Sequence, residues 1–313
     1  MIAGLDVGGT KVNALLIDPA TGVVHARRRA SSDGSGSELV DTIGSLVAQL
    51  DEAGSGSVDA IGLGIAGLAS RSGVVRYSPN LPRLVEFPIG SSIESATGRP
   101  VVVGNDASTA AWAEARFGAG RDVSDFVFVA LGTGIGVGVV ANGDIVLGGN
   151  GFAGEAGHMV IDLDGPTHHT GQQGPWEYFA SGSALGRLGR EAAADGHFDA
   201  GLQAAGTVDA LTGVHVSNAV AVGDAQALQI LDEFCHEVAR GAANLVMLLD
   251  PRRIVLGGGL TDIGEPLRAG VAAGLAGTVL GADHRPEVEV VMAELGADAG
   301  AVGAGLLAAR RLG

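Results

Sequence analysis

Two Gly-rich turns, each set between apolar runs, constrain the fold of this chain more than any other feature. The first covers residues 6–11, between apolar residues 2–5 and the strand-like residues 12–18. The second lies within residues 131–140. Each pattern predicts a strand, a tight turn and a second strand. Glycine has no Cβ, so the backbone N–H groups of such a turn can converge on an anion. A plain hairpin explains either turn taken alone, but their repetition favours two phosphate-binding turns.

Polar residues in these turns point to the same chemistry. Asp6 ends the first strand, where its carboxylate can face a hydrated Mg²⁺ ion. The candidate phosphate-binding residues are Gly8, Gly9, Thr10 and Lys11 in the first turn and Gly132, Thr133 and Gly134 in the second. The hydroxyl of Thr10 and the cation of Lys11 add to the exposed N–H groups beside them.

Composition limits the function classes. With 313 residues the chain is long enough for two domains. Its net charge of -16 argues against a nucleic-acid surface, which needs a basic face. No apolar run reaches transmembrane length, and we expect no membrane partner. The start of the chain lacks the pattern of a signal peptide, and the single Cys235 excludes an intrachain disulfide. These features predict a cytoplasmic protein.

Residues 60–67 carry a glycine pattern that also occurs in dinucleotide-binding turns. Gly62, Gly64 and Gly67 have the required spacing, and Glu86 lies at a plausible distance for a ribose-binding acid. That motif needs a helix starting at the glycines, whereas residues 70–73 read as a turn. We therefore expect a strand that ends beside a ligand. Gly67 at its end and Asn80 in the following Pro-bounded loop are candidate substrate-binding residues.

Residues 101–106 predict a buried strand that ends in Asn105 and Asp106, followed by a helix over residues 107–117. Ligands of α/β sheets bind at such strand ends. A carboxylate there is placed to accept a proton from a hydroxyl. Asp106 could equally be a simple helix N-cap, and its position alone favours neither role.

The remaining pattern predicts a duplicated α/β architecture. Each half has a Gly-turn hairpin, then helices, then a strand ending in glycine, at Gly67 and at Gly257. The predicted helices cover residues 37–53, ended by Gly54, residues 224–249 and residues 299–312. Residues 118–120 read as a domain junction. We expect a cleft between the halves and a nucleotide triphosphate held by the two hairpins.

Two further segments carry candidate ligands. Glu155 and His158 lie three residues apart, a carboxylate and an imidazole suited to binding hydroxyl groups. The irregular residues 167–177 contain His168 and His169, and a helix is expected to start at Ser181. Adjacent histidines suggest a metal, but four-ligand spacing is absent, which favours solvated loop histidines.

Taken together, the chain resembles the ROK family of sugar kinases, within the actin, hexokinase and Hsp70-like ATPase superfamily. Five motifs occur in the family's order: residues 6–11, Asn105–Asp106, residues 131–136, the signature ending in Glu155, Gly157 and His158, and the turn Gly257, Gly258 and Gly259. The resemblance implies two actin-like (ribonuclease H-like) α/β domains with the active site in the cleft between them. We expect a small domain of residues 1–118 plus the terminal helix 299–313, and a large domain of residues 119–298.

The resemblance also implies roles for individual residues. Asp106 matches the catalytic base, and the glycines at 257–259 match the turn on the adenosine side. The hydroxyl-binding residues implied are Asn105, Glu155, His158 and Glu177. ATP with Mg²⁺ is the implied phosphate donor, and the reaction is direct phosphoryl transfer held by the two turns. A homodimer or homotetramer is expected.

One motif departs from the family. Relatives usually carry three cysteines that bind a structural zinc together with the signature histidine. Here those positions hold His168, Thr170 and Pro175, whereas Glu177 is retained. Threonine and proline cannot replace thiolate ligands, so we predict that the chain holds no structural zinc.

The acceptor stays open at this stage. Glucose, phosphorylated on its 6-hydroxyl, is the family default, and an amino sugar, an N-acetylhexosamine or a cyclitol is the alternative. A sugar-responsive regulator of the same family is disfavoured, because those proteins carry an N-terminal helix-turn-helix domain and here the first phosphate strand begins at Ile2. A sensor without catalysis is disfavoured by Asp106.

Overall fold

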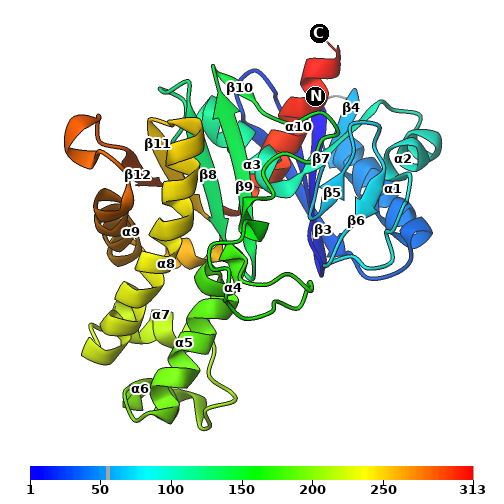
Figure 1. Ribbon diagram of the computed structural model, residues 1–313. Helices are drawn as coiled ribbons and strands as arrows, with labels where there is room; N and C mark the ends of the chain where they lie inside the picture. Colours follow the sequence, from blue (N-terminus) through cyan, green and yellow to red (C-terminus); the bar gives the residue numbers. More distant parts are fainter. Residues whose placement is uncertain (54–56, 313) are drawn as a thin grey trace. The chain divides into compact units, whose positions relative to one another are not determined.

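A computed structural model describes residues 1–53 and 57–312. The elements form two mixed sheets flanked by helices (Figure 1). Contacts within the chain divide it into two compact units. Unit 1 contains residues 1–124, 138–154 and 294–313, and unit 2 contains residues 125–137 and 155–293. Among the described residues, no helix is both long and apolar enough to cross a bilayer.

The sheet of unit 1 has the strand order β3-β2-β1-β4-β7. Its strands are β1 (Ile2–Val7), β2 (Lys11–Ile17), β3 (Val24–Ser31), β4 (Ala60–Ile65) and β7 (Val101–Asn105). Strands β1 and β2 form the expected antiparallel hairpin, whereas β4 and β7 run parallel to β1. Val7 pairs with Ile65, and Ile65 with Asn105, so the carboxyl ends of three strands meet at one edge. Such an edge is where ligands of α/β sheets bind.

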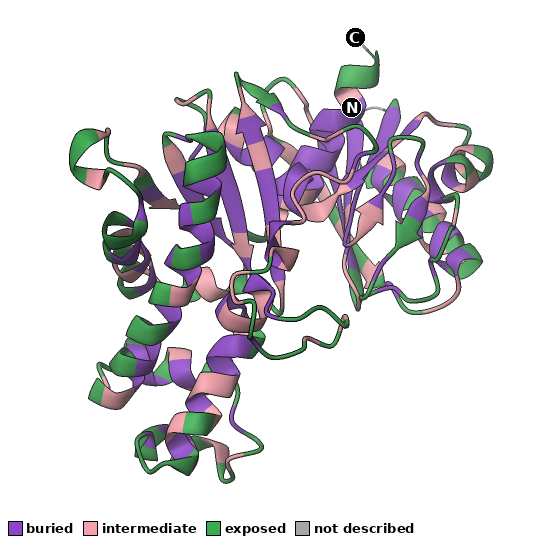
Figure 2. Cartoon of the chain, in the orientation of Figure 1, coloured by how far each residue is buried: buried purple, intermediate pink, exposed green. Residues whose placement is uncertain are grey.

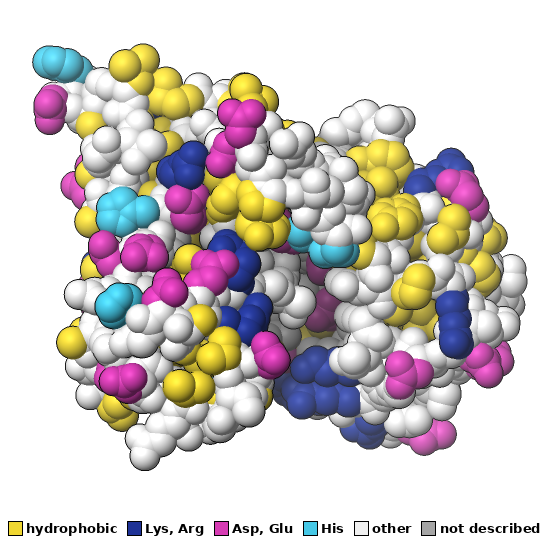
Figure 3. Space-filling view, turned by 60° about the horizontal axis from the view of Figure 1, so that its bottom comes forward, with side chains coloured by type: hydrophobic (Ala, Val, Ile, Leu, Met, Phe, Trp, Pro, Cys, Tyr) yellow, Lys and Arg dark blue, Asp and Glu magenta, His cyan; other side chains and the backbone are white. Residues whose placement is uncertain are grey.

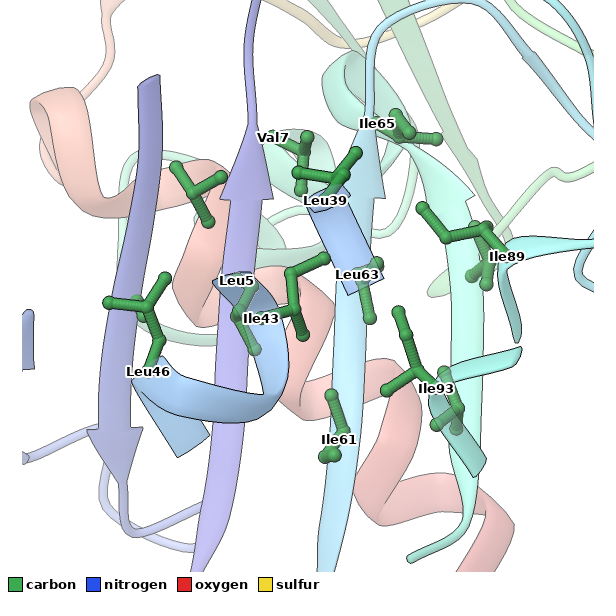
Figure 4. Close-up of a cluster of buried hydrophobic side chains, with 14 of the residues drawn as sticks. Leu5, Val7, Leu39, Ile43, Leu46, Ile61, Leu63, Ile65, Ile89 and Ile93 are labelled. Carbon is green, nitrogen blue, oxygen red and sulfur yellow. The ribbon is translucent and has the colours of Figure 1, made fainter. Parts of the chain in front are cut away.

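One face of this sheet carries the apolar core. Helices α1 (Gly36–Ala53) and α2 (Ile89–Thr97) cover it, and Leu39, Ile43 and Ile93 from the helices pack against strand residues (Figure 4). Leu5 and Val7 in β1 and Leu63 in β4 are each at most 1% exposed. Side chains alternate between the two faces of a strand. The isoleucine, valine and leucine side chains therefore determine which face of each strand points into this core.

The opposite face is packed through small residues. Helices α3 (Asp106–Phe117) and α10 (Ala299–Leu312) lie against it. A Cβ added at Gly4 would stand 2.0 Å from the Ala301 carbonyl oxygen, and one at Gly62 would stand 1.9 Å from that of Ala304. No side chain fits at such a distance, so the helix backbone rests directly on the strands. Gly305 of α10 serves the same close approach, and Gly303 does so between α10 and α3.

The second sheet has the order β10-β9-β8-β11-β12. Its strands are β8 (Phe126–Leu131), β9 (Ile135–Ala141), β10 (Asp144–Ile145), β11 (Arg253–Gly257) and β12 (Glu289–Met292). β11 runs parallel to both β8 and β12. The strands of both sheets are largely buried, whereas the helices alternate between buried and exposed faces (Figure 2).

The helices of unit 2 follow the second Gly-rich turn. They are α4 (Trp176–Ala180), α5 (Gly182–Ala194), α6 (Asp199–Ala205), α7 (Gly213–Ala221), α8 (Ala225–Leu249) and α9 (Glu265–Thr278). Helix α8 matches its prediction, with the Asp224 side chain accepting from the Ala227 N–H as an N-cap. Cys235 lies buried on its apolar face, where burial raises the pKa of its thiol to about 12. It behaves as a small apolar residue, as expected.

Single-turn 3-10 helices complete the chain. They are η1 (Ala156–His158), η2 (Gly259–Ile263), η3 (Ala282–His284) and η4 (Gly296–Asp298), and the short strands β5 (Leu68–Ala69) and β6 (Val75–Tyr77) form a separate ribbon. Because β5 follows β4 directly, no helix starts at the glycines of residues 62–67. The dinucleotide interpretation was therefore rightly rejected. Glu86, its candidate acid, pairs with Arg76 on the surface.

The units differ from the expected domain boundaries. Residues 118–120 are a turn inside unit 1, in which the buried Glu114 carboxylate accepts from the Ala119 N–H. Residues 138–154 also group with unit 1. A Cβ at Gly138 would meet Ala111 of α3 at 2.4 Å, and Arg310 of α10 pairs with Asp144 at 2.6 Å. These contacts join distant segments, which periodicity along the chain cannot reveal.

Several elements escaped the sequence analysis, among them strands β3 and β12 and helices α2, α4, α6, α7 and α9. Strand β3 was not predicted, because it alternates partly buried positions with arginines on an exposed edge. Helix α4 lies within a segment read as irregular, and its five residues are too few for a helical period. The predicted end of the first helix at Gly54 lies outside the described residues.

Candidate functional site

The first Gly-rich turn is a tight connection between β1 and β2. The Gly8 N–H donates to the Lys11 carbonyl at 3.0 Å. A Cβ at Gly9 would stand 3.1 Å from the carbonyl oxygen of Asn80, so the turn and the predicted substrate loop approach each other closely. Gly9 and Asn80 line a cavity of about 380 Å³, together with residues 32–34, 39 and 81–84. Thr10 and Lys11 are exposed at the tip of the turn.

Two carboxylates stand at the carboxyl edge of the first sheet. Asp6 lies one residue before the end of β1, and Asp106 follows β7 directly. The pKa of Asp6 is raised to about 7, chiefly by burial and then by the Asp106 carboxylate, while Lys11 opposes the shift. Burial likewise raises the pKa of Asp106, against a hydrogen bond from the Ala107 N–H at 2.8 Å. Carboxylates held partly out of water beside one another are typical of functional sites.

The cap of α3 resolves the question left open by the sequence. The Asn105 side chain, not Asp106, is the N-cap, and its Oδ1 accepts from the Ser108 N–H at 3.1 Å. Its Nδ2 donates to the Gly67 carbonyl at 3.3 Å, which joins two predicted substrate residues. Asp106 occupies the first helical position, where the positive end of the helix dipole favours an anion. Its carboxylate is therefore not needed to start the helix.

The second Gly-rich turn is held by two helices that follow it. The Gly182 N–H donates to the Gly132 carbonyl at 2.7 Å, and the Ser183 hydroxyl donates to the Thr133 carbonyl at 2.8 Å. At the other end of the turn, the Ile135 N–H donates to Oε2 of Glu177 at 2.7 Å. The carbonyls of the turn are thus bound by α5, and the start of β9 is bound by α4.

Glu177 lies closer to this turn than the sequence indicated. A Cβ at Gly134 would stand only 2.2 Å from its Oε2. Its other oxygen, Oε1, lies 3.4 Å from Nε2 of His168, and the two side chains are 15% and 10% exposed. Burial is the main cause that lowers the pKa of His168, followed by the neighbouring His169. His168 is therefore neutral at neutral pH.

Glu155 and His158, which end the family signature, lie together. Nε2 of His158 is 4.0 Å from Oε2 of Glu155, and both side chains are about one-third exposed. They flank the single turn η1, whose Gly157 sits against β9: a Cβ there would stand 2.6 Å from the Ile135 carbonyl oxygen. Nδ1 of His158 is buried and has no hydrogen-bond partner among the described residues.

The third glycine cluster follows β11. Gly258 has a φ of 84° and lies so close to β8 that a Cβ would stand 2.5 Å from the Leu131 carbonyl oxygen. A Cβ at Gly257 would meet the Phe128 ring at 2.3 Å, whereas Gly259 has open space. The structure thus brings residues 257–259 beside the end of the strand that leads into the second turn. Bare backbone there leaves room for a flat ring.

Each unit therefore assembles its own part of the predicted site. Unit 1 brings together Asp6, the first turn, Gly67, Asn80, Asn105 and Asp106, and unit 2 holds the remaining candidates. The sequence analysis missed Ser183 and the link between His168 and Glu177. The only signal for Ser183 was its place at the start of the helix expected from Ser181.

Comparison with known proteins identifies the family. The family model described as ROK family matches residues 2–311. The chain belongs to the ROK family. It is 34% identical over 311 residues to a glucokinase of Streptomyces coelicolor, covering 97% of this chain and 96% of that protein. It is 32% identical over 311 residues to an N-acetylmannosamine kinase of Shigella boydii, covering 97% of each. Among solved structures, a ROK family glucokinase from Streptomyces griseus in complex with glucose and AMPPNP matches with a TM-score of 0.88, 35% identity and 99% coverage of both chains.

These comparisons confirm the ROK resemblance and the actin-like α/β fold. This ROK protein is an ATP-dependent sugar kinase. The chain is acidic, with a net charge of -16, and acidic side chains are widely spread on the face shown in Figure 3.

The donor sets for magnesium, which is expected, and for the zinc of the family, which is not, differ. Magnesium fits unit 1, because the buried Asp6 carboxylate lies near that of Asp106 and a divalent cation would relieve their repulsion. Zinc does not fit the loop of residues 166–175. Within residues 1–53 and 57–312, no group of three or more histidine, cysteine or acidic side chains is placed to hold a metal. Whether the purified protein holds zinc stays a prediction for elemental analysis.

Proposed function

We propose that the protein transfers the γ-phosphoryl group of ATP to the 6-hydroxyl of a hexose, with glucose as the preferred acceptor. The observation that carries this proposal is Asp106, a carboxylate at the end of β7 with a raised pKa and no duty as the cap of α3. A base with a pKa raised toward neutrality is suited to accept a hydroxyl proton near pH 7. The glucokinases among its relatives support glucose.

The other polar residues are assigned to orientation. Asn105, Glu155, His158 and Glu177 bind the remaining hydroxyls of the sugar, and Gly67 and Asn80 contact it through the loops beside the first turn. Each hydroxyl held by a fixed partner removes freedom from the nucleophile. Because the transition state of phosphoryl transfer is loose, such positioning supplies much of the rate enhancement. Asn105 is already fixed by its two hydrogen bonds to Ser108 and Gly67.

The glycine turns are assigned to the nucleotide. Backbone N–H groups at Gly8, Gly9 and residues 132–134 bind the phosphates, with Thr10 and Lys11 beside them, and residues 257–259 lie along the adenosine. Asp6 would hold Mg²⁺, which neutralises charge on the phosphates when bound. The AMPPNP complex of the Streptomyces griseus relative supports ATP as the donor.

A test of the base separates binding from turnover. Asp106→Asn keeps the size of the side chain and removes its proton-accepting charge. We expect sugar binding, measured by titration calorimetry, to be retained and kcat to fall by at least about a hundredfold. Asp41→Asn, at an exposed position of α1 in the same unit, is the matched control. Near-normal turnover of the Asp106 variant would refute the assignment of the base.

An N-acetylhexosamine is the second candidate acceptor, favoured by the similarity to N-acetylmannosamine kinases at 32% identity. ADP formation should be measured with glucose, mannose, glucosamine, N-acetylglucosamine, N-acetylmannosamine and myo-inositol, the last representing cyclitols. We expect the highest kcat/KM with glucose. A higher value with an N-acetylated sugar would replace glucose by that class, and tight sugar binding without ADP formation would indicate a regulator.

We also propose a homodimer or homotetramer. The mass of the protein in solution, measured by light scattering, tests this directly. A monomer at micromolar concentration would refute it.

A further inference from the structure

A chain of polar contacts links the loop before α4 to the second Gly-rich turn. Nδ1 of His168 lies 2.9 Å from the Thr170 hydroxyl, and Nε2 of the same ring lies 3.4 Å from Oε1 of Glu177. Oε2 of Glu177 accepts from the Ile135 N–H at 2.7 Å. Four residues from two separate segments thus form one line, here called the Thr170–Ile135 relay. Its members all lie in unit 2.

The loop around His168 is closed by its own backbone. The His168 N–H donates to the Gln172 carbonyl at 2.7 Å, and the Gly174 N–H donates to the Pro166 carbonyl at 2.9 Å. Thr167 and Gln173 form an isolated antiparallel bridge between these bonds. The imidazole therefore projects from a short, hydrogen-bonded turn. Its direction does not require a metal ion.

Helix α4 is anchored independently of this loop. Trp176 is fully buried, and its indole N–H donates to the Glu237 carbonyl of α8 at 3.0 Å. The anchor fixes the backbone of Glu177, the next residue, but not the rotation of its carboxylate. The contacts from Ile135 and His168 remain to set that rotation.

We propose that His168 is a positioning residue for Glu177, holding the carboxylate in the orientation in which it binds a sugar hydroxyl. Because an ionised Glu177 carboxylate can only accept, the proton of the neutral ring belongs on Nε2, which faces Oε1, and Nδ1 then accepts from the Thr170 hydroxyl. Burial, which lowers the pKa of His168, keeps this neutral form at neutral pH. A histidine tautomer is set in this way by the partner of its other nitrogen.

The relay gives Glu177 two simultaneous partners. An ionised carboxylate has about four acceptor positions. The Ile135 N–H uses one and His168 faces another, which leaves acceptor positions for a substrate hydroxyl. Glu177 therefore joins the sugar-binding residues to the turn that is proposed to bind phosphate. The family usually carries cysteines at the positions of His168 and Thr170. Here these two residues form part of the relay, which uses no metal ion.

This inference rests on the proposed sugar-binding role of Glu177, and a double-mutant cycle tests it. The variants are His168→Ala, Glu177→Gln and the two combined, with His197→Ala as the control. His197 is an exposed histidine in another loop of unit 2. We expect His168→Ala to raise the KM for glucose by about tenfold, because a buried carboxylate loses one partner. The KM for ATP should change less, since the Ile135 bond is retained.

Two further variants separate positioning from loop folding. His168→Gln places an amide N–H where Nε2 stood and should restore the KM for glucose to within about threefold of the original protein. Thr170→Val removes the donor to Nδ1 and should reproduce part of the defect of His168→Ala. A residue that merely folded the loop would not be rescued by the amide of glutamine.

The double-mutant cycle also separates a failure of the Thr170–Ile135 relay from a failure of the proposed sugar acceptor. Within Glu177→Gln, the loss of His168 should have little further effect on the KM for glucose, because contacting residues are not additive. Additive effects would overturn the proposal. If no sugar in the panel is phosphorylated, the acceptor assignment fails. The same cycle measured by thermal unfolding without substrate then tests the relay, with about 2–4 °C of coupling expected.

Elemental analysis completes the test. Each variant should be dialysed against a chelator and assayed again. Unchanged activity supports a metal-free relay. Zinc near one equivalent per chain, with activity lost on its removal, would overturn it.

Discussion

Asp6 is a residue whose charge should weaken the folded state. Its pKa is about 7 in the folded chain, against an ordinary value of 3.8. Below pH 3.8 such a carboxyl is protonated in both the folded and the unfolded state, and it costs no stability. As the pH rises from 3.8 through about 7, the free energy of unfolding falls. At about 1.4 kcal/mol per pH unit, the complete loss amounts to about 4 kcal/mol.

The perturbation is Asp6→Asn, which keeps the size of the side chain and removes its charge. Size matters, because α10 packs closely here: a Cβ at Gly300 would stand 3.0 Å from Cγ of Asp6. Between pH 5 and pH 8 we expect the free energy of unfolding of the variant to rise relative to the original protein by about 2–3 kcal/mol. Asp106, whose pKa burial also raises, and His168, whose pKa burial lowers, contribute to the remaining pH dependence.

The assay is urea unfolding at several pH values between 5 and 8, extrapolated to water. Asp18→Asn is the control. Hydrogen bonds from Ala20 and Thr21 lower the pKa of that exposed carboxyl, so its removal should not stabilise the protein as the pH rises. Parallel curves for Asp6→Asn and the original protein would refute the reasoning. The stabilised variant should also lose activity, as expected when a charge is kept for function at the expense of stability.

Three further predictions follow from close contacts and ligand types. Gly62→Ala should lower the free energy of unfolding by about 3 kcal/mol in urea, because the new Cβ overlaps the Ala304 carbonyl, whereas Gly44→Ala, with open space in α1, should stabilise the protein slightly. Gly134→Ala should raise the KM values for both ATP and sugar, because it displaces Glu177 from the second turn; an unchanged KM for ATP would contradict this. Mass spectrometry of the purified protein should find no structural zinc, and a stoichiometric amount would show that the histidines form a site.

Much of the fold could be predicted from periodicity and glycine placement. The β1–β2 hairpin, the helices α1, α3, α8 and α10, and the strands β4, β7 and β11 all lie where the pattern indicated. Long helices with an apolar face and strands ending in glycine carry strong local signals. The arginine-rich edge strand β3 and the short helix α4 lack such signals. Helices α2, α6, α7 and α9 and strand β12 were also not predicted.

The placement of polar residues at strand ends could be predicted, but the role of each residue could not. Position alone left Asp106 between two roles. The structure assigns the cap to Asn105, because its backbone is extended whereas Asp106 is already helical. This choice depends on the dihedral angles of a single residue. No spacing rule distinguishes two adjacent polar residues at that level.

Glu177 shows where sequence reasoning ends. The family resemblance placed it in the sugar site, and nothing local contradicted that role. Its hydrogen bond to Ile135 joins residues 42 positions apart in the sequence. The bond forms because Trp176 is buried against α8. This anchor sets which way the side chains of the five-residue helix α4 point. Gly134 then becomes necessary, since any side chain there would occupy the position of the carboxylate. A glycine that the sequence presents as a phosphate-binding residue therefore has a second function, which is to admit Glu177. Substitution of Gly134 and substitution of Glu177 should accordingly impair the same two substrates.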